Sequence, residues 1–181
     1  AFVAYGGGIY LNNSSPKLIE LIVTNNAASV EGGGIYLNNS LSIINNLVIT
    51  DIYSRYDGGV VMMHNCFPMI LNTIIIDNSS DKNEGGIYSN NSLAQLINVT
   101  ISNNSASYDG LGMGGGQGGG MRIGGGNGPE LINVIIDNNI GTLDGGGIMM
   151  GGSFENPTQL TNVTITNNYT TGMGGGIDLW G

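Results

Sequence analysis

The sequence predicts an all-β fold, a β-solenoid in which each repeat forms one rung of a parallel β-helix. A glycine-led segment, "GGGIYL" at residues 6–11, recurs along the whole chain, and a second segment, "LIELIVTNN" at residues 18–26, recurs between its copies. The repeats are spaced 25 to 29 residues apart, with one longer step. No segment shows an apolar period of 3.6 residues over ten or more residues, so helical repeats fit badly.

The two recurring segments indicate two short strands per rung and about six to seven rungs. The longer step contains a glycine-rich insertion near residues 107–117. We expect residues 1–181 to form a single domain. The chain starts and stops within a repeat, which predicts rungs without caps at both ends, as in a fragment of a longer chain or a subunit that stacks on its copies.

Strand alternation predicts which side chains face the core, because every second residue of a strand points to the same side. In the second segment, aligning the isoleucines gives an inward column of Val23, Ile49, Ile76, Ile101, Ile136 and Ile165. Two residues earlier lies another inward column of Leu21, Leu47, Ile74, Val99, Val134 and Val163. The column between them is predicted to face outward and to contact a partner: Ile22, Val48, Ile75, Thr100, Ile135 and Thr164.

The first segment carries a second outward column, in which Tyr10, Tyr36 and Tyr88 are candidates to contact a sugar or a neighbouring rod. Its inward positions include Val60 and Met62 in the third repeat. The glycines before these strands allow positive φ and close approach of neighbouring rungs. After the second segment, a stacked ladder of side chains is predicted to bond rung to rung, at Asn25, Asp51, Asn78, Asn103, Asn138 and Asn167.

Charge and composition exclude several classes of partner. The formal net charge is −9, with only 4 Lys and Arg residues, so the surface should repel nucleic acid and anionic lipid. No apolar run approaches the roughly 18 to 20 residues that span a bilayer. The one cysteine, Cys66, excludes an internal disulfide framework.

No catalytic constellation is recognisable, so the sequence predicts a protein that is not an enzyme and has no cofactor. Asp77 and Asp137 are expected in one outward column with the rung of Ser102 between them, roughly 10 Å apart, which is too far for a retaining glycosidase pair. His64 and Cys66 are too few for a structural zinc site and form no triad. We expect His64 to lie in a solvated turn.

Acids precede the glycines in several repeats, at Glu31, Asp57, Glu84 and Asp144. A solvated acidic ridge is the favoured interpretation. Calcium between rungs is the alternative, because stacked carboxylates repel and Ca²⁺ takes six to eight oxygen ligands. N-glycosylation sequons occur at Asn12, Asn13, Asn38, Asn78, Asn90, Asn98, Asn103, Asn162 and Asn168.

The repeated pattern "GGGIYLNNSSPKLIELIVTNN" resembles the right-handed parallel β-helix repeats of bacterial and archaeal surface or secreted proteins. It is similar in style to the repeats of chlamydial polymorphic outer-membrane proteins. The resemblance covers nearly the whole chain, and it implies a right-handed solenoid located outside the cell or on its surface. Such families include adhesins, passenger domains and polysaccharide-processing enzymes. The paired aspartates, Gly-His-Gly and Arg-x-Lys of polygalacturonases are missing here.

Three functional hypotheses remain at this stage. The first is a non-enzymatic extracellular structural or adhesive β-helix that self-associates or binds a cell-surface partner, including a filament subunit that assembles end to end or laterally. The second is a β-helix that binds or cleaves carbohydrate through the tyrosine column and scattered acids. The third, minor hypothesis is an ice-binding solenoid.

Overall fold

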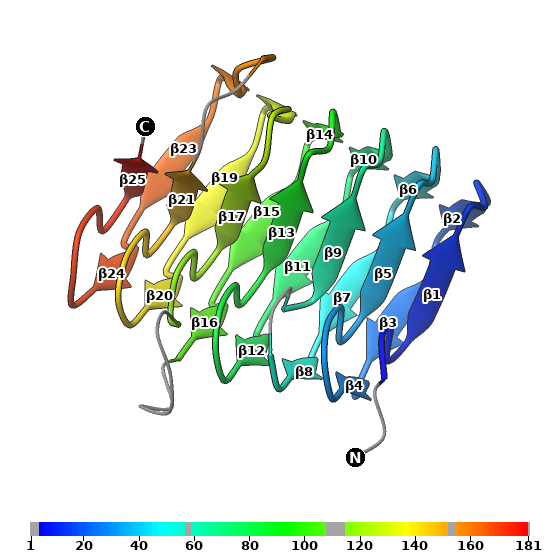
Figure 1. The fold of residues 1–181 in the computed structure, drawn as a ribbon, viewed down its shortest axis with the longest axis horizontal. Coiled ribbons are helices and arrows are strands. Elements are labelled where there is room, and N and C mark those ends of the chain that lie inside the picture. The colour runs from blue at the N-terminus through cyan, green and yellow to red at the C-terminus, as the bar shows by residue number, and fades with distance from the viewer. Residues whose placement is uncertain (1–3, 57–58, 108–114, 152–154, 181) are drawn as a thin grey trace.

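The computed structural model describes residues 4–56, 59–107, 115–151 and 155–180 and shows a parallel β-solenoid (Figure 1). These residues contain strands and no helix. In Figure 1 the chain ascends through the front strands β1, β5 and β9, descends behind them through β3, β7 and β11, and advances from β1 on the right to β25 on the left. This winding is right-handed, as is usual for crossovers between parallel strands.

Each rung contributes one strand to each of four parallel sheets. Sheet 1 consists of β1 (Ile9–Asn12), β5 (Ile35–Asn38), β9 (Val61–His64), β13 (Ile87–Asn90), β17 (Met121–Gly124), β21 (Ile148–Gly151) and β25 (Ile177–Trp180). Sheet 2 consists of β2 (Lys17–Ile19), β6 (Ile43–Asn45), β10 (Met69–Leu71), β14 (Gln95–Ile97), β18 (Glu130–Ile132) and β22 (Gln159–Thr161).

Sheets 3 and 4 complete each rung. Sheet 3 consists of β3 (Ile22–Thr24), β7 (Val48–Thr50), β11 (Ile74–Ile76), β15 (Thr100–Ser102), β19 (Ile135–Asp137) and β23 (Thr164–Thr166). Sheet 4 has two-residue strands: β4 (Ala27–Ala28), β8 (Tyr53–Ser54), β12 (Ser79–Ser80), β16 (Ser105–Ala106), β20 (Ile140–Gly141) and β24 (Tyr169–Thr170). The prediction of two strands per rung is therefore wrong, because a single residue with positive φ turns the chain sharply within what reads as one segment.

Asparagine occupies most of these sharp corners. Between sheets 2 and 3, Asn46, Asn72 and Asn98 have φ of 59°, 49° and 57°. Asparagine tolerates this left-handed region better than other non-glycine residues do. The glycines serve the corner between sheets 4 and 1, where a Cβ on Gly33 would lie 2.6 Å from the Tyr53 carbonyl oxygen. The glycine segment before each sheet 1 strand is held in place because the backbone of the neighbouring rung packs directly against it.

The third rung differs from the sequence alignment by one residue. Ile75 pairs in register with Ile49 and Ile101 and is 0% exposed, so it faces the core and not the solvent. Ile74, predicted to face inward, is 42% exposed and pairs with Val48 and Thr100 on the outer face. In sheet 1 the residue in register with Ile35 and Ile87 is likewise Val61, one position after the predicted Val60.

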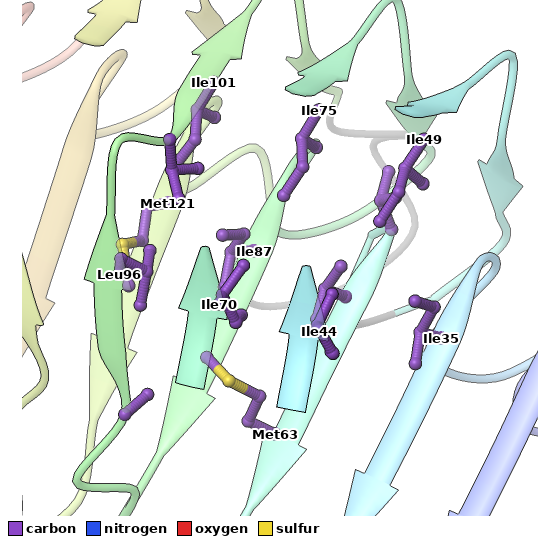
Figure 2. Close-up of a cluster of buried hydrophobic side chains, with 14 of the residues drawn as sticks. Ile35, Ile44, Ile49, Met63, Ile70, Ile75, Ile87, Leu96, Ile101 and Met121 are labelled. Carbon is purple, nitrogen blue, oxygen red and sulfur yellow. The ribbon is translucent and has the colours of Figure 1, made fainter. Parts of the chain in front are cut away.

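The core consists of columns of apolar side chains that run continuously along the solenoid axis (Figure 2). Isoleucines from sheet 3 face residues from sheets 1 and 2, as Ile49, Ile44 and Ile35 show in one rung. Successive rungs repeat the arrangement, so each buried side chain packs on its equivalents above and below. Sheet 4 turns only small residues toward the interior, such as Ala28, Ser54 and Ala106, because the glycine segment lies close to its backbone.

A buried asparagine ladder runs along the corner between sheets 3 and 4. Asn78 Nδ2 donates to Asn104 Oδ1 at 2.8 Å, and Asn104 Nδ2 donates to Asn139 Oδ1 at 3.0 Å. Each of these amides also donates to a carbonyl of the preceding rung, Ile49 for Asn78 and Ile75 for Asn104. Each Oδ1 also accepts a hydrogen bond from the backbone N–H of the equivalent residue one rung earlier. These donors are Ile52 for Asn78, Asn78 for Asn104 and Asn104 for Asn139. The buried polar groups are thus satisfied by residues from three rungs.

Exposed ladders run along the surface beside the buried one. After sheet 3, Asn103 donates to Asp77, and Asn138 donates to Asn103. After sheet 2, Asn98 donates to Asn72, and Asn133 donates to Asn98. The predicted asparagine ladder is confirmed at Asn103, Asn138 and Asn167. In the third rung Asp77 occupies the exposed position, and Asn78 belongs to the buried ladder. In the first two rungs the side chains of Asn25 and Asp51 bond instead to a threonine of their own rung.

Replacing Asn104 by alanine is expected to lower the free energy of unfolding by about 3 kcal/mol, because it leaves the buried N–H of Asn78 and the carbonyl of Ile75 without side-chain partners. Asn103→Gly is the matched control, since glycine tolerates the φ of 53° and only the two exposed bonds to Asp77 and Asn138 are lost. We expect the control to cost about 1 kcal/mol or less. Urea denaturation followed by circular dichroism measures both; equal losses would contradict a dominant buried ladder.

Candidate functional site

An aromatic strip lies on the outer surface of sheet 1. The Tyr10 and Tyr36 rings stack with centroids 5.2 Å apart and an interplanar angle of 9°. The His64 ring lies 6.2 Å from both the Tyr36 ring and the Tyr88 ring. Strand register stacks Tyr10 on Tyr36, but it places Met62 between Tyr36 and Tyr88. The His64 ring reaches both tyrosines from two residues further along β9. Tyr36 is buried by its neighbours, whereas Tyr10 stays exposed, so only the first of the three predicted tyrosines offers a largely open ring.

Burial beside an acid changes the ionisation of this strip. The pKa of Tyr36 is raised to about 12, first by burial and then by the Glu31 carboxylate. The phenol therefore stays protonated throughout the physiological range. Tyr36 thus presents a neutral ring to its neighbours, suited to packing and hydrogen bonding.

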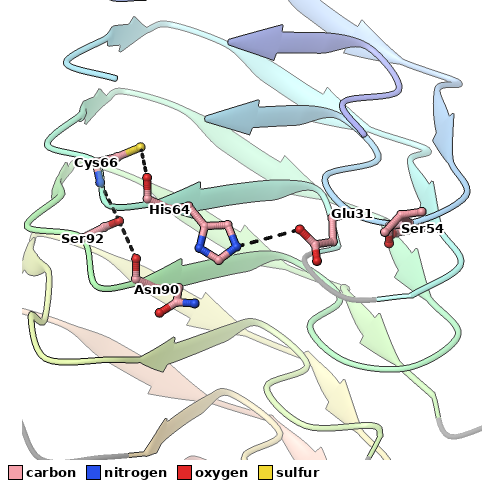
Figure 3. Close-up of polar contacts among 7 residues, drawn as sticks. Glu31, Ser54, His64, Cys66, Asn90 and Ser92 are labelled. Carbon is pink, nitrogen blue, oxygen red and sulfur yellow. Dashed lines mark hydrogen bonds and ion pairs between the residues drawn. The ribbon is translucent and has the colours of Figure 1, made fainter. Parts of the chain in front are cut away.

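His64 lies at the end of β9 and is half-buried, which contradicts its predicted place in a solvated turn. Its Nε2 is 3.9 Å from Glu31 Oε2 (Figure 3). Burial lowers the pKa of the imidazole below its usual value. At neutral pH the ring is thus uncharged and packs as a fourth ring among the tyrosines.

Cys66 does not share a site with this histidine. Its sulfur faces inward and donates to the His64 carbonyl oxygen at 2.9 Å, while the imidazole points away toward Glu31 (Figure 3). Ser40 and Ser92 make the same bond to the residue two positions earlier in their rungs. Burial raises the pKa of the Cys66 thiol. The cysteine therefore replaces a serine in a structural column.

An ion pair joins the fourth and fifth rungs below the strip. Arg122 Nη1 lies 2.9 Å from Glu84 Oε1, and the Glu84 side chain is fully buried. The Arg122 guanidinium also lies 5.2 Å from the centroid of the Tyr88 ring. Glu84 has a φ of 46° at a position, three residues before the strand, where Gly32, Gly118 and Gly145 stand in other rungs. A carboxylate in a glycine position is held there by its arginine.

The acids considered for calcium do not converge. Glu31 and Asp144 each lie four residues before a sheet 1 strand, but on rungs that are four apart. Glu84 lies one residue later in its rung and pairs with Arg122. Asp57 lies outside the described residues. Among the residues that the structure describes, no group of three or more His, Cys, Asp and Glu side chains could hold a metal ion.

The outer face of sheet 3 is the second surface of interest. Its first column is Ile22, Val48, Ile74, Thr100, Ile135 and Thr164, and its second is Thr24, Thr50, Ile76, Ser102, Asp137 and Thr166. Ile74 thus replaces Ile75 in the predicted contact column. Asp77, predicted beside Asp137 on this face, lies instead at the corner. The face is therefore more regular and less charged than expected, and its contact role stays a prediction.

The sequons occupy different environments. Asn78 is 2% exposed and bonded within the buried ladder, so a glycan there would break the ladder. Asn168 accepts two bonds from Asn139. The exposed sequons are Asn12, Asn13, Asn98, Asn103 and Asn162, with Asn38 and Asn90 half-buried.

Comparison with known proteins gives one local match. Residues 20–38 match the Chlamydia polymorphic membrane protein repeat. This stretch contains β3, β4, the glycine corner and β5. It is much shorter than the resemblance in sequence, which extends over nearly the whole chain. No curated protein and no solved structure matches the chain significantly. In the part of the chain described here, no helix has the length and apolar character needed to cross a bilayer.

Sequence reasoning missed the Glu84–Arg122 pair and the placement of His64. A signal for the pair is present, since "NEGGI" at residues 83–87 has one glycine fewer than "EGGGI" at residues 31–35. When these two segments are aligned on the strand that follows them, and not on the acid, Glu84 takes the position of the first glycine, Gly32. The insertion predicted at residues 107–117 lies largely outside the described residues.

Arg122→Gln is expected to lower the free energy of unfolding by about 3 kcal/mol, because the buried Glu84 carboxylate loses its cationic partner. Adding Glu84→Gly should restore most of the loss, since glycine suits the positive φ and removes the buried charge. Urea denaturation of wild type, single and double variants measures the coupling. A double variant no more stable than Arg122→Gln would contradict the pairing.

Acidification is expected to destabilise the protein through His64. The folded pKa of His64 is lower than the unfolded value of about 6.5, so the unfolded chain binds more protons and stability falls as pH drops through that value. His64→Asn, the residue found at the equivalent positions 38 and 90, should remove this dependence. Urea denaturation midpoints of the wild type and of His64→Asn, measured between pH 7.5 and 5.5, test this dependence. If the two midpoints fall with pH by the same amount, His64 does not contribute.

Proposed function

We propose that the chain is part of a non-enzymatic extracellular or cell-surface β-helix with a structural or adhesive role, in which the outer face of sheet 3 makes the contacts. The single observation that carries the proposal is this face. All six residues of its first column are β-branched, and Ile22, Ile74 and Ile135 are 73%, 42% and 45% exposed. Exposed apolar columns of this kind commonly mark contact surfaces.

Charge supports contact through this face. The chain carries a formal net charge of −9, yet Asp137 is the one charged residue in the two outer columns of sheet 3. Two such faces can approach with little repulsion. The match to a repeat of Chlamydia polymorphic membrane proteins supports the surface location.

The size of the face favours weak, repeated contacts. Six strands about 4.8 Å apart and three residues wide give roughly 250 Å², well below the roughly 800 Å² per partner of a stable interface. A single module should therefore associate weakly. Several modules acting together would gain avidity through their high effective concentration.

Sedimentation velocity and electron microscopy at rising protein concentration test the proposal. We expect weak lateral association of the wild type and at least tenfold weaker association of Ile74→Lys combined with Ile135→Lys. The matched control carries the same charge on exposed residues of another surface, Ile19→Lys with Leu41→Lys. A wild type that stays monomeric at millimolar concentration, or a control that weakens association equally, would count against the face.

The corrected register also favours ice binding as a second candidate. A rigid, flat array of threonine and β-branched methyl groups repeats every rung, and the charge of Asp77 lies outside it. The same lysine variant distinguishes this candidate. Ice-crystal shaping by wild type that disappears in the variant supports it, and unmodified crystal growth rejects it.

A further inference from the structure

A groove opens at the corner between sheets 1 and 2 in the last three rungs. In the first four rungs four residues connect these sheets, as between β13 and β14. Five residues connect β17 to β18, and seven connect β21 to β22. A cavity of about 220 Å³ lies at this corner, lined by residues of the fourth, fifth and sixth rungs.

One wall of the groove is apolar and owes its shape to a glycine. Two residues before each sheet 2 strand, the second to fourth rungs carry Leu41, Phe67 and Leu93, and the first two of these are 61% and 52% exposed. The fifth rung has Gly128 there, and a Cβ at Gly128 would lie 2.4 Å from Thr158 Oγ1. Thr158 excludes a side chain at this position, so Gly128 stands between Leu93 and Pro157 in this column, and all three residues line the groove.

The other wall is a row of polar side chains. Gln95, Glu130 and Gln159 begin β14, β18 and β22 and pair in register, so they line the groove one rung apart. Gln95 Nε2 donates to Glu130 Oε2 at 3.0 Å, which orients both groups. Side-chain amides offer donors and acceptors together, and a carboxylate adds acceptors.

We propose that this groove binds a neutral saccharide chain. Sugar rings combine apolar faces, which suit the Leu93 and Pro157 wall, with hydroxyl groups that both donate and accept, which suit the amides. The volume is below the roughly 300 to 1,000 Å³ of drug-sized sites, so the groove holds about one ring while the chain continues over Phe67. Glu130 and the net charge of −9 exclude anionic saccharides.

An extended peptide fits the groove less well. Peptides that bind sheets gain most of their affinity from main-chain hydrogen bonds to an open edge strand. Of the three strands beside the groove, β14 and β18 have paired neighbours on both sides, and β22 has its open edge on the side away from β18. The site lies on a different face from sheet 3, so the lateral-contact proposal and this one can fail independently.

Isothermal titration calorimetry with three hexasaccharides tests the site: cellohexaose and chitohexaose as neutral probes and the galacturonic acid hexamer as the anionic probe. We expect at least one neutral probe to bind and the anionic probe not to bind. Gln95→Ala and Gln159→Ala should each weaken binding about tenfold. Lys17→Ala is the matched control, because Lys17 begins β2 in the same column, three rungs from Gln95.

Wild-type protein that binds neither neutral probe at millimolar concentration overturns the proposal. Tighter binding of the galacturonic acid hexamer also overturns it, since the groove would then have the wrong charge preference. Binding that survives both glutamine substitutions would place the ligand elsewhere. Thermal melting of each variant confirms that these outward-facing changes leave the fold intact.

Discussion

The whole architecture depends on side-chain amides that bond from rung to rung inside the protein. The corner between sheets 3 and 4 buries backbone groups that the strand ladders do not reach. Asn78, Asn104 and Asn139 satisfy these groups while bonding to one another. Unpaired polar groups in this place would each cost about 1 to 3 kcal/mol, so the ladder makes the buried corner possible. With the corners held, the apolar columns stack at a constant repeat.

The outer surfaces follow from this regularity. On sheet 3, constant register turns a short β-branched motif into a flat face that runs along the axis. On sheet 1, it stacks Tyr10 on Tyr36, and the His64 ring contacts Tyr36 from two residues further along its own strand. At the corner between sheets 1 and 2, the connection from β17 to β18 is one residue longer than in earlier rungs and leaves the core columns in register, as expected for insertions in a repeat protein.

Much of the fold could be predicted, because a spacing near 26 residues and recurring Gly and Asn turns are visible in the sequence. The third rung was misaligned, since "GGVV" has two glycines where five other rungs have three, and Val60 occupies the third glycine position. Counting a constant 26 residues from Ile49 would have placed Ile75 inward. The environment of His64 could not be predicted, because it depends on rings from two other rungs that no local pattern reveals.

The most direct test of the asparagine ladder is the hydrogen-exchange rate of side-chain amides, measured by nuclear magnetic resonance. The Nδ2 protons of Asn78 and Asn104 bond within the core, whereas those of Asn98 and Asn103 bond at the surface. We expect the first pair to exchange at least a hundredfold more slowly than the second. Equal exchange rates for the two pairs would contradict a buried ladder that holds the rungs together.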